Sequence, residues 1–162
     1  MDIGSGNGYP SSALSNFAPH RFIFRGLLVE SMEGLLQSLK FENPEMQKHV
    51  ITLVGRAAKS KGAKKNWRRT QTLYWQGTPM ARRSDEYKAF LDDAFRALFT
   101  QNEAARRALL ATKDAVLTHS IGKSKESETV LTRAEFVRRL TDIRRELQMK
   151  GARVSAPSQR AT

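Results

Sequence analysis

Glu33, Gln37 and Lys40 can bring a carboxylate, an amide and an amine together on one face of a helix. They are four and three residues apart, a spacing that puts side chains on a common helical face. The stripe borders the apolar stripe of the same segment, so the three groups can point into a cleft. A carboxylate there can act as acid, base or nucleophile. On an open surface the same spacing gives only a weak ion pair, and the spacing alone leaves both interpretations open.

Positive charge is concentrated in the middle of the chain. The whole chain has 28 Lys and Arg against 16 Asp and Glu, a net charge of +12. Ten of these bases and no acid lie between Met46 and Ser84, and seven fall between Arg56 and Arg69. Trp67 lies inside the run, and cations with an aromatic ring can hold a phosphate and stack on a base. The charge favours a phosphate-bearing partner, and a merely solvated basic loop is the alternative.

Three loop or helix-start features are weaker candidates. Asn16 and Phe17 can supply an amide and an aromatic wall, or simply form a turn with a core ring. Gly34 costs about 1 kcal/mol inside a helix relative to Ala and can leave room for a ligand. The glycine-rich segment 4–8 is too close to the start to follow a strand, as a dinucleotide fingerprint requires. We therefore predict a flexible lead-in there.

The composition excludes several classes of site. The 162 residues contain no cysteine, which excludes disulfides, thiolate zinc sites and cysteine nucleophiles. The three histidines, His20, His49 and His119, have no metal-ligand spacing, so we expect no metal and no cofactor. There is no secretory signal and no apolar run of membrane-spanning length. We expect a cytoplasmic protein that has no membrane partner.

The hydrophobic pattern predicts the elements that must position these residues. Two short strands, 22–24 and 27–29, flank a turn, and Ser31 caps a helix that runs to about Glu42. Asn43 and Pro44 begin the next helix, whose apolar stripe is Met46, Val50, Leu53, Val54 and Ala57. Residues 58–83 are expected to be irregular, with a short strand at 72–75.

The second half of the chain predicts three helices. The clearest begins at Ser84 and carries the regularly spaced stripe Tyr87, Phe90, Leu91, Ala94, Phe95, Leu98 and Phe99. A second helix runs from Asn102 to Leu110, and a short strand is expected at 115–117. A capping box at Thr132–Glu135 opens the third helix. We predict a mainly α, compact single domain over residues 1–150, with a small β-hairpin and short strands, a disordered basic tail over 151–162, and a monomer.

Several segments together resemble the NADAR (YbiA-like) family. Its signature is roughly Ser-Asn-Phe, then a helix with the pattern Ser-x-Glu-His-x-x-Gln-x-x-Lys-Phe, then a basic Lys-Asn-Trp element. The similar segments here are Ser15–Phe17, Ser31–Phe41, Lys65–Trp67 and the leucine-rich Ala108–Thr112. The order and spacing agree over about residues 9–148. Segments 9–17 and 119–123 resemble a phage and bacterial branch of the family.

The resemblance implies a YbiA-like fold and an N-glycosidase activity on ADP-ribose- or ribose-phosphate-linked substrates. Some members remove ADP-ribose from guanine in nucleic acid and so reverse DarT-type toxins, whereas the YbiA type cleaves an early riboflavin-pathway intermediate. Glu33 would be the catalytic carboxylate and Trp67 an active-site aromatic. Two departures concern substrate choice: Gly34 replaces the usual His, and residues 121–125 replace a Trp-Gly-rich loop.

N-glycosidase chemistry suggests roles for the other candidates. Lys40 or Lys65 can hold a diphosphate as point charges. Trp67 and Phe17 can stack on a base or adenine. The side-chain amides of Asn16 and Gln37 can bind ribose hydroxyls. The predicted substrate-binding residues are Asn16, Phe17, Gln37, Lys40, Lys65, Trp67, His119, Gly122 and Lys123.

Three hypotheses follow for the function. The first is a glycosidase that acts on ADP-ribosylated guanine in DNA or RNA, as an antitoxin or repair enzyme in the host cytoplasm if the chain is phage-encoded. The second is a glycosidase for a free nucleotide-like metabolite, such as a riboflavin intermediate or a nucleotide signal. The third is a nucleic-acid-binding protein without activity, in which Glu33 is structural.

Overall fold

Helices and two antiparallel hairpins make up the computed structural model, which describes residues 1–155 and side chains as far as Arg153. The elements in chain order are α1 (Ser11–Leu14), β1 (Phe22–Phe24), β2 (Leu27–Val29), α2 (Met32–Ser38), α3 (Pro44–Val50), α4 (Gly55–Ala63), the 3₁₀ turn η1 (Trp67–Arg69), β3 (Thr72–Trp75), β4 (Thr78–Ala81), α5 (Asp85–Gln101), α6 (Glu103–Ala111), the 3₁₀ turn η2 (Glu126–Glu128) and α7 (Arg133–Ser155). β1 pairs with β2, and β3 with β4. The predicted mainly α single-domain fold is confirmed.

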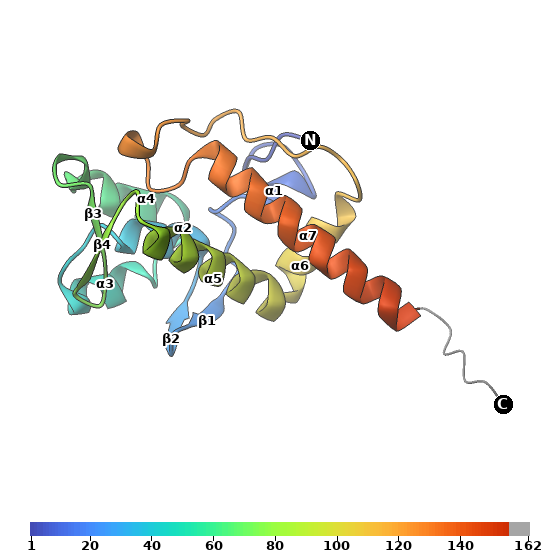
Figure 1. Ribbon diagram of the computed structural model, residues 1–162, viewed down its shortest axis with the longest axis horizontal. Coiled ribbons are helices and arrows are strands. Elements are labelled where there is room, and N and C mark those ends of the chain that lie inside the picture. Colours follow the sequence, from blue (N-terminus) through green and yellow to red (C-terminus); the bar gives the residue numbers. More distant parts are fainter. Residues whose placement is uncertain (156–162) are drawn as a thin grey trace.

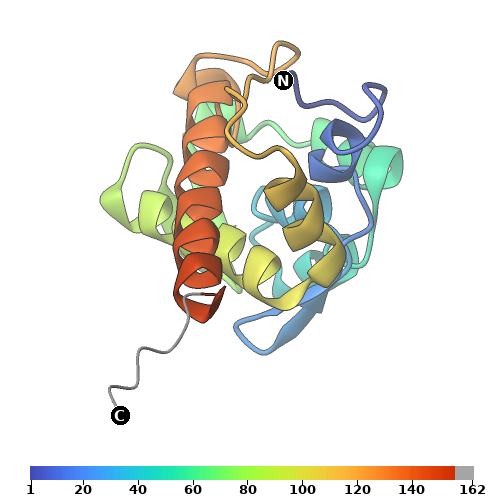
Figure 2. The same cartoon turned by 90° about the vertical axis from the view of Figure 1, so that its right-hand side faces the viewer.

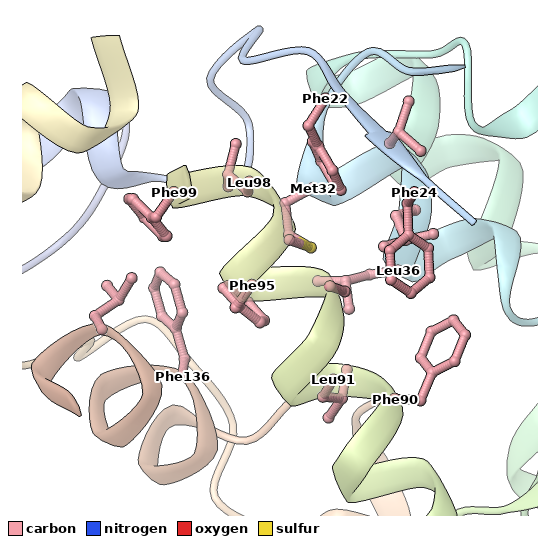
Figure 3. Packing of buried hydrophobic residues seen from close by; sticks show 14 of the residues in the cluster. Phe22, Phe24, Met32, Leu36, Phe90, Leu91, Phe95, Leu98, Phe99 and Phe136 are labelled. Atoms are coloured by element: carbon pink, nitrogen blue, oxygen red, sulfur yellow. The ribbon is translucent and has the colours of Figure 1, made fainter. Parts of the chain in front are cut away.

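Helix α5 is the centre of the hydrophobic core. All seven residues of its predicted apolar stripe are buried. Figure 3 shows α5 between Phe136 of α7 on one side and Phe22 and Phe24 of β1 on the other. The rings of Phe24 and Phe90 meet edge to face, with centroids 5.1 Å apart, an arrangement that aromatic pairs favour. Helix α7 also packs on α6 (Figures 1 and 2).

Side-chain caps fix where the helices begin. The hydroxyl of Ser31 accepts from Gly34 N at 3.0 Å at the start of α2, and Asn43 caps α3 in the same way. At α7, Glu135 N donates to Thr132 Oγ1 at 3.1 Å while Thr132 N donates to Glu135 Oε1 at 2.8 Å. This is the predicted capping box, so the helix starts expected at these three positions are confirmed.

The region between α2 and β3 differs from the prediction. The helix that begins at Pro44 ends at Val50, and a separate helix begins at Gly55, whose φ is +57°. A single stripe through Met46 and Ala57 was therefore wrong, and Met46 is exposed. Helix α4 continues to Ala63, where an irregular chain was expected. It was missed because it carries basic residues in place of an apolar stripe.

Smaller differences lie at the ends of elements. Helix α2 ends at Ser38, before the expected Glu42, and residues 11–14 form a short helix that the sequence did not predict. The expected strand at 115–117 is absent from the described residues, where Asp2 and Thr118 form an isolated bridge. Helix α7 runs to Ser155, past the expected domain end at Lys150. The rest of the predicted tail, 156–162, lies outside the described residues. None of the described helices is long and apolar enough to span a membrane.

Candidate functional site

All ten predicted site residues line one cavity of about 590 Å³. Helix α2, helix α4 with η1, the loop after α1, and the connection from α6 to α7 form its walls. The predicted residues that it brings together are Asn16, Phe17, Glu33, Gln37, Lys40, Lys65, Trp67, His119, Gly122 and Lys123. They come from segments up to 107 residues apart, from position 16 to position 123. The fold thus joins the sequence motifs into one site.

Glu33 lies in the first turn of α2 and is held from both sides. Its backbone N–H donates to Asn16 O at 3.0 Å, which ties the helix to the loop after α1. Gln37 Nε2 donates to Glu33 Oε1 at 2.9 Å. Only 9% of Glu33 is exposed, so the stripe predicted from the sequence faces the cavity and not an open surface.

Gly62 of α4 gives the Gln37 amide its space. A Cβ at Gly62 would overlap the amide oxygen of Gln37. That oxygen is buried and has no hydrogen-bond partner among the described residues. The absence of a Cβ at Gly62 therefore allows Gln37 to reach Glu33. The amide oxygen of Gln37 remains beside the cavity as an acceptor without a donor among the described residues.

Burial raises the pKa of Glu33 above its ordinary value of 4.5. The hydrogen bond from Gln37 and the positive charges of Lys59 and Lys40 act in the opposite direction. The charged form is disfavoured because the low-dielectric surroundings solvate it poorly. Such a shift is common at functional sites and gives a carboxylate that exchanges protons closer to neutral pH.

Six cationic residues line the same cavity as Glu33. The cationic side chains that line the cavity are Lys40, Lys59, Lys64, Lys65, Arg68 and Lys123, whereas the acids are Glu33 and Glu128. Burial is the main cause that lowers the pKa of Lys40 to about 8, and the neighbouring cations Arg68 and Lys123 contribute to this shift, whereas Glu33 opposes it. The cavity therefore attracts an anion, and of its two carboxylates only Glu33 is buried, whereas Glu128 is exposed.

Two rings contribute to the cavity in different ways. Phe17 is partly exposed, and Lys59 Nζ lies 5.9 Å from the centroid of its ring. Trp67 is only 6% exposed and belongs to the hydrophobic core. Trp67 therefore supports the wall of the cavity as well as lining it, and removing its ring would destabilise the fold by about 3–5 kcal/mol.

His119 and Gly122 line the cavity from the connection between α6 and α7. His119 Nδ1 lies 2.8 Å from Ile3 O, and Gly122 N donates to His119 O at 3.0 Å. A Cβ at Gly122 would lie 2.5 Å from His119 Cδ2. Gly122 thus allows the backbone to pass close to the imidazole ring.

Sequence reasoning missed several residues of the cavity and misjudged one neighbour. Lys59 and Arg68 were counted only as part of the basic run, because α4 was not expected to face α2. Gly34 is not among the residues that line the cavity. A Cβ there would lie 2.5 Å from Leu53 O, so the glycine serves close backbone packing, and the expectation that it leaves room for a ligand was wrong. No group of three or more His, Asp or Glu side chains suited to a metal ion occurs among the described residues.

Comparison with known proteins gives one family, one relative and one solved structure. A family model described as bacteriophage protein GP30.3 matches residues 8–145. An uncharacterized 17.1 kDa protein from the Gp30-rIII intergenic region of enterobacteria phage T4 is 38% identical over 141 residues, which are 85% of this chain and 91% of that protein. The NMR structure of the E. coli protein YbiA superposes with a TM-score of 0.63 at 17% identity, over 99% of this chain and 90% of YbiA. The YbiA-like fold is thus confirmed.

Proposed function

Because this chain belongs to the bacteriophage protein GP30.3 family and has a YbiA-like fold, we propose that it is an N-glycosidase that removes ADP-ribose from ADP-ribosylated guanine in nucleic acid. The observation that carries the proposal is the environment of Glu33. It is a buried carboxylate in a cavity whose other ionisable groups are mainly cations. Such a site combines attraction for a diphosphate with one buried negative charge at Glu33.

Glu33 suits the developing charge of this reaction. The bond between the anomeric carbon and the base nitrogen breaks, and its electron pair leaves with the base. The sugar becomes oxocarbenium-like, as in glycoside hydrolysis. Water oxygen then bonds to the anomeric carbon, and its proton balances the charge on the departing base. Glu33 can stabilise the cation, attack it, or orient the water, and in each role it must be ionised when the bond breaks.

The remaining groups fit the other parts of an ADP-ribosyl substrate. Lys40 and Lys65 can contact the diphosphate as mobile point charges. Phe17 offers a partly exposed ring on which a base can stack. The amide oxygen of Gln37, which has no donor among the described residues, can accept a hydrogen bond from a ribose hydroxyl. This hydrogen bond would offset the desolvation free energy of the buried oxygen.

A free ribosyl-phosphate metabolite is the second candidate substrate. The observation that favours it is that six cations line the cavity itself, so the anion they attract can be a small molecule held inside. A polymer would in addition contact basic residues outside the cavity, such as Arg69, which is exposed and does not line it. The two substrates therefore differ in how many phosphates they present to the protein.

An assay of ADP-ribose release tests the proposal and separates these candidates. We expect the protein to release ADP-ribose from a guanine-ADP-ribosylated oligonucleotide, detected by mass spectrometry. Raising salt from 50 to 200 mM should lower the apparent affinity for the oligonucleotide by roughly tenfold or more, because several phosphate contacts release counterions.

The contrary results are equally specific. Turnover of a ribosyl-phosphate metabolite alone, with little dependence on salt, would favour the second candidate. Salt-dependent binding of the unmodified oligonucleotide, with no release from either substrate, would favour a binding protein in which Glu33 is structural.

The pH profile of kcat/KM provides a further prediction. Activity should rise at a pH above the ordinary carboxyl range, because the raised pKa of Glu33 delays its ionisation. It should fall near pH 8, where Lys40 loses the proton that gives it charge. Lys40→Arg keeps the charge at every accessible pH and should remove the falling limb. The exposed Lys48→Arg is the control and should leave both limbs in place; a falling limb that persists in Lys40→Arg would contradict the assignment.

A further inference from the structure

The N-terminal segment lies beside the connection between α6 and α7 (Figures 1 and 2). Asp2 and Ile3 hold the part of this connection that carries His119, more than one hundred residues further along the chain. Ser120 N and Thr118 Oγ1 donate to Asp2 Oδ1 at 2.8 and 3.0 Å. Ser120 Oγ donates to Asp2 Oδ2 at 2.6 Å. These hydrogen bonds hold the pKa of Asp2 below its usual value. Both neighbours of His119 in the chain are therefore fixed by one carboxylate.

The imidazole ring of His119 is itself fixed on three sides. Nδ1 lies 2.8 Å from Ile3 O, the ring meets Phe136 nearly edge to face at 5.0 Å, and Cδ2 lies against Gly122. A carbonyl oxygen only accepts, so Nδ1 must carry a proton, and a neutral ring then has its lone pair on Nε2. The structure gives Nε2 no hydrogen-bond partner within the described part of the chain, and His119 is one of the residues that line the cavity.

We propose that Asp2 and Ile3 are positioning residues that hold His119 as the neutral Nδ1–H tautomer, so that Nε2 accepts a hydrogen bond from a hydroxyl of the substrate. This inference rests on the proposed function, since it takes the cavity as the substrate site. The cations of the cavity can only donate. A sugar hydroxyl that donates therefore needs one of the few acceptors there, and Nε2 is an acceptor only in this tautomer.

The tautomer can be measured without any turnover. Long-range ¹H–¹⁵N NMR at pH 8 should show Nε2 of His119 without a proton. His20 is an internal reference with the opposite arrangement, because its Nε2 lies 2.7 Å from Ala13 O. Addition of ADP-ribose should shift the Nε2 resonance of His119. A proton on Nε2 of His119 in the free protein would overturn the proposal.

Asp2→Ala tests the positioning role in the same spectra. Loss of the carboxylate should mix the two tautomers of His119. The matched control is Asp114→Ala, which removes an exposed aspartate from the same connection with the same change of charge. Equal spectra for wild type and Asp2→Ala would show that Asp2 does not position the ring.

His119→Asn separates the two nitrogen atoms. The Asn amide nitrogen occupies the place of Nδ1 and keeps the donor to Ile3 O, whereas the acceptor at Nε2 is lost. We expect kcat/KM to fall about tenfold, and the unfolding temperature to fall slightly because the ring contact with Phe136 is lost. Asp2→Ala should then add no further loss in the His119→Asn background, because both act through one group.

The possible outcomes test the role of His119 separately from the proposed N-glycosidase activity. An active enzyme whose kcat/KM is unaffected by His119→Asn would overturn the role of Nε2 and leave the N-glycosidase assignment intact. A protein with the expected tautomer, but with no turnover and no response of Nε2 to ADP-ribose, would overturn both the proposed function and the hydroxyl contact.

Discussion

Glu33→Gln should fold normally and lose turnover by about a thousandfold or more, since it replaces the buried carboxylate proposed to meet the oxocarbenium-like charge. The substitution keeps the size of the side chain. An amide oxygen at this position can still accept from Gln37 Nε2, as Glu33 Oε1 does at 2.9 Å. Binding of ADP-ribose should therefore survive. The measurement is single-turnover release of ADP-ribose by the variant and the wild type, together with their thermal unfolding.

A matched control removes an equal charge outside the cavity. Glu42 lies nine residues further along the chain, is exposed, and does not line the cavity around Glu33. Glu42→Gln should leave turnover within about twofold of the wild type, because a distant exposed charge is screened by solvent. Turnover by Glu33→Gln at the wild-type rate would remove Glu33 from the mechanism. Loss of both turnover and folding would instead make it a structural residue.

Local periodicity is what made part of the site predictable. Glu33 and Gln37 are one helical turn apart, so their shared face follows from the helix itself. The hydroxyl of Ser31 marks the start of that helix in the sequence and caps it in the structure. The same logic predicted α5, where seven apolar residues at regular spacing are all buried. Where side chains interact within one helix, their spacing in the sequence predicts which of them lie on the same face.

Contacts between distant segments had no such local signal. The approach of Gly62 to Gln37 depends on α4 packing on α2, and α4 has a basic sequence without an apolar stripe. The hydrogen bond between His119 and Ile3 O joins residues 116 positions apart. Neither pairing leaves a periodic pattern, because each depends on tertiary packing and on one small or polar residue.

Gly34 illustrates how a departure from a family pattern can have a structural cause. The resemblance to the NADAR family places a histidine here, beside the proposed catalytic carboxylate. In this protein the Cα of Gly34 faces the backbone that follows α3: an added Cβ would lie 2.5 Å from Leu53 O and 3.2 Å from Val50 O. Ser31 Oγ also donates to Leu53 O at 2.9 Å. The helix and this turn are too close for any side chain at position 34.

Restoring the histidine with Gly34→His should therefore destabilise the protein by more than about 3 kcal/mol, because the carbonyl groups that it would meet belong to the backbone and cannot move aside cheaply. Gly34→Ala should lower the free energy of unfolding by about 1–3 kcal/mol for the same reason. The control is Gly151→Ala in α7, where an added Cβ meets no heavy atom within 4 Å, and where helix propensity predicts a gain of up to about 1 kcal/mol. Urea denaturation followed by circular dichroism measures all three. A free energy of unfolding for Gly34→His within about 1 kcal/mol of the wild type would mean that the turn after α3 can retreat, and the glycine would then have to be explained by substrate choice and not by packing.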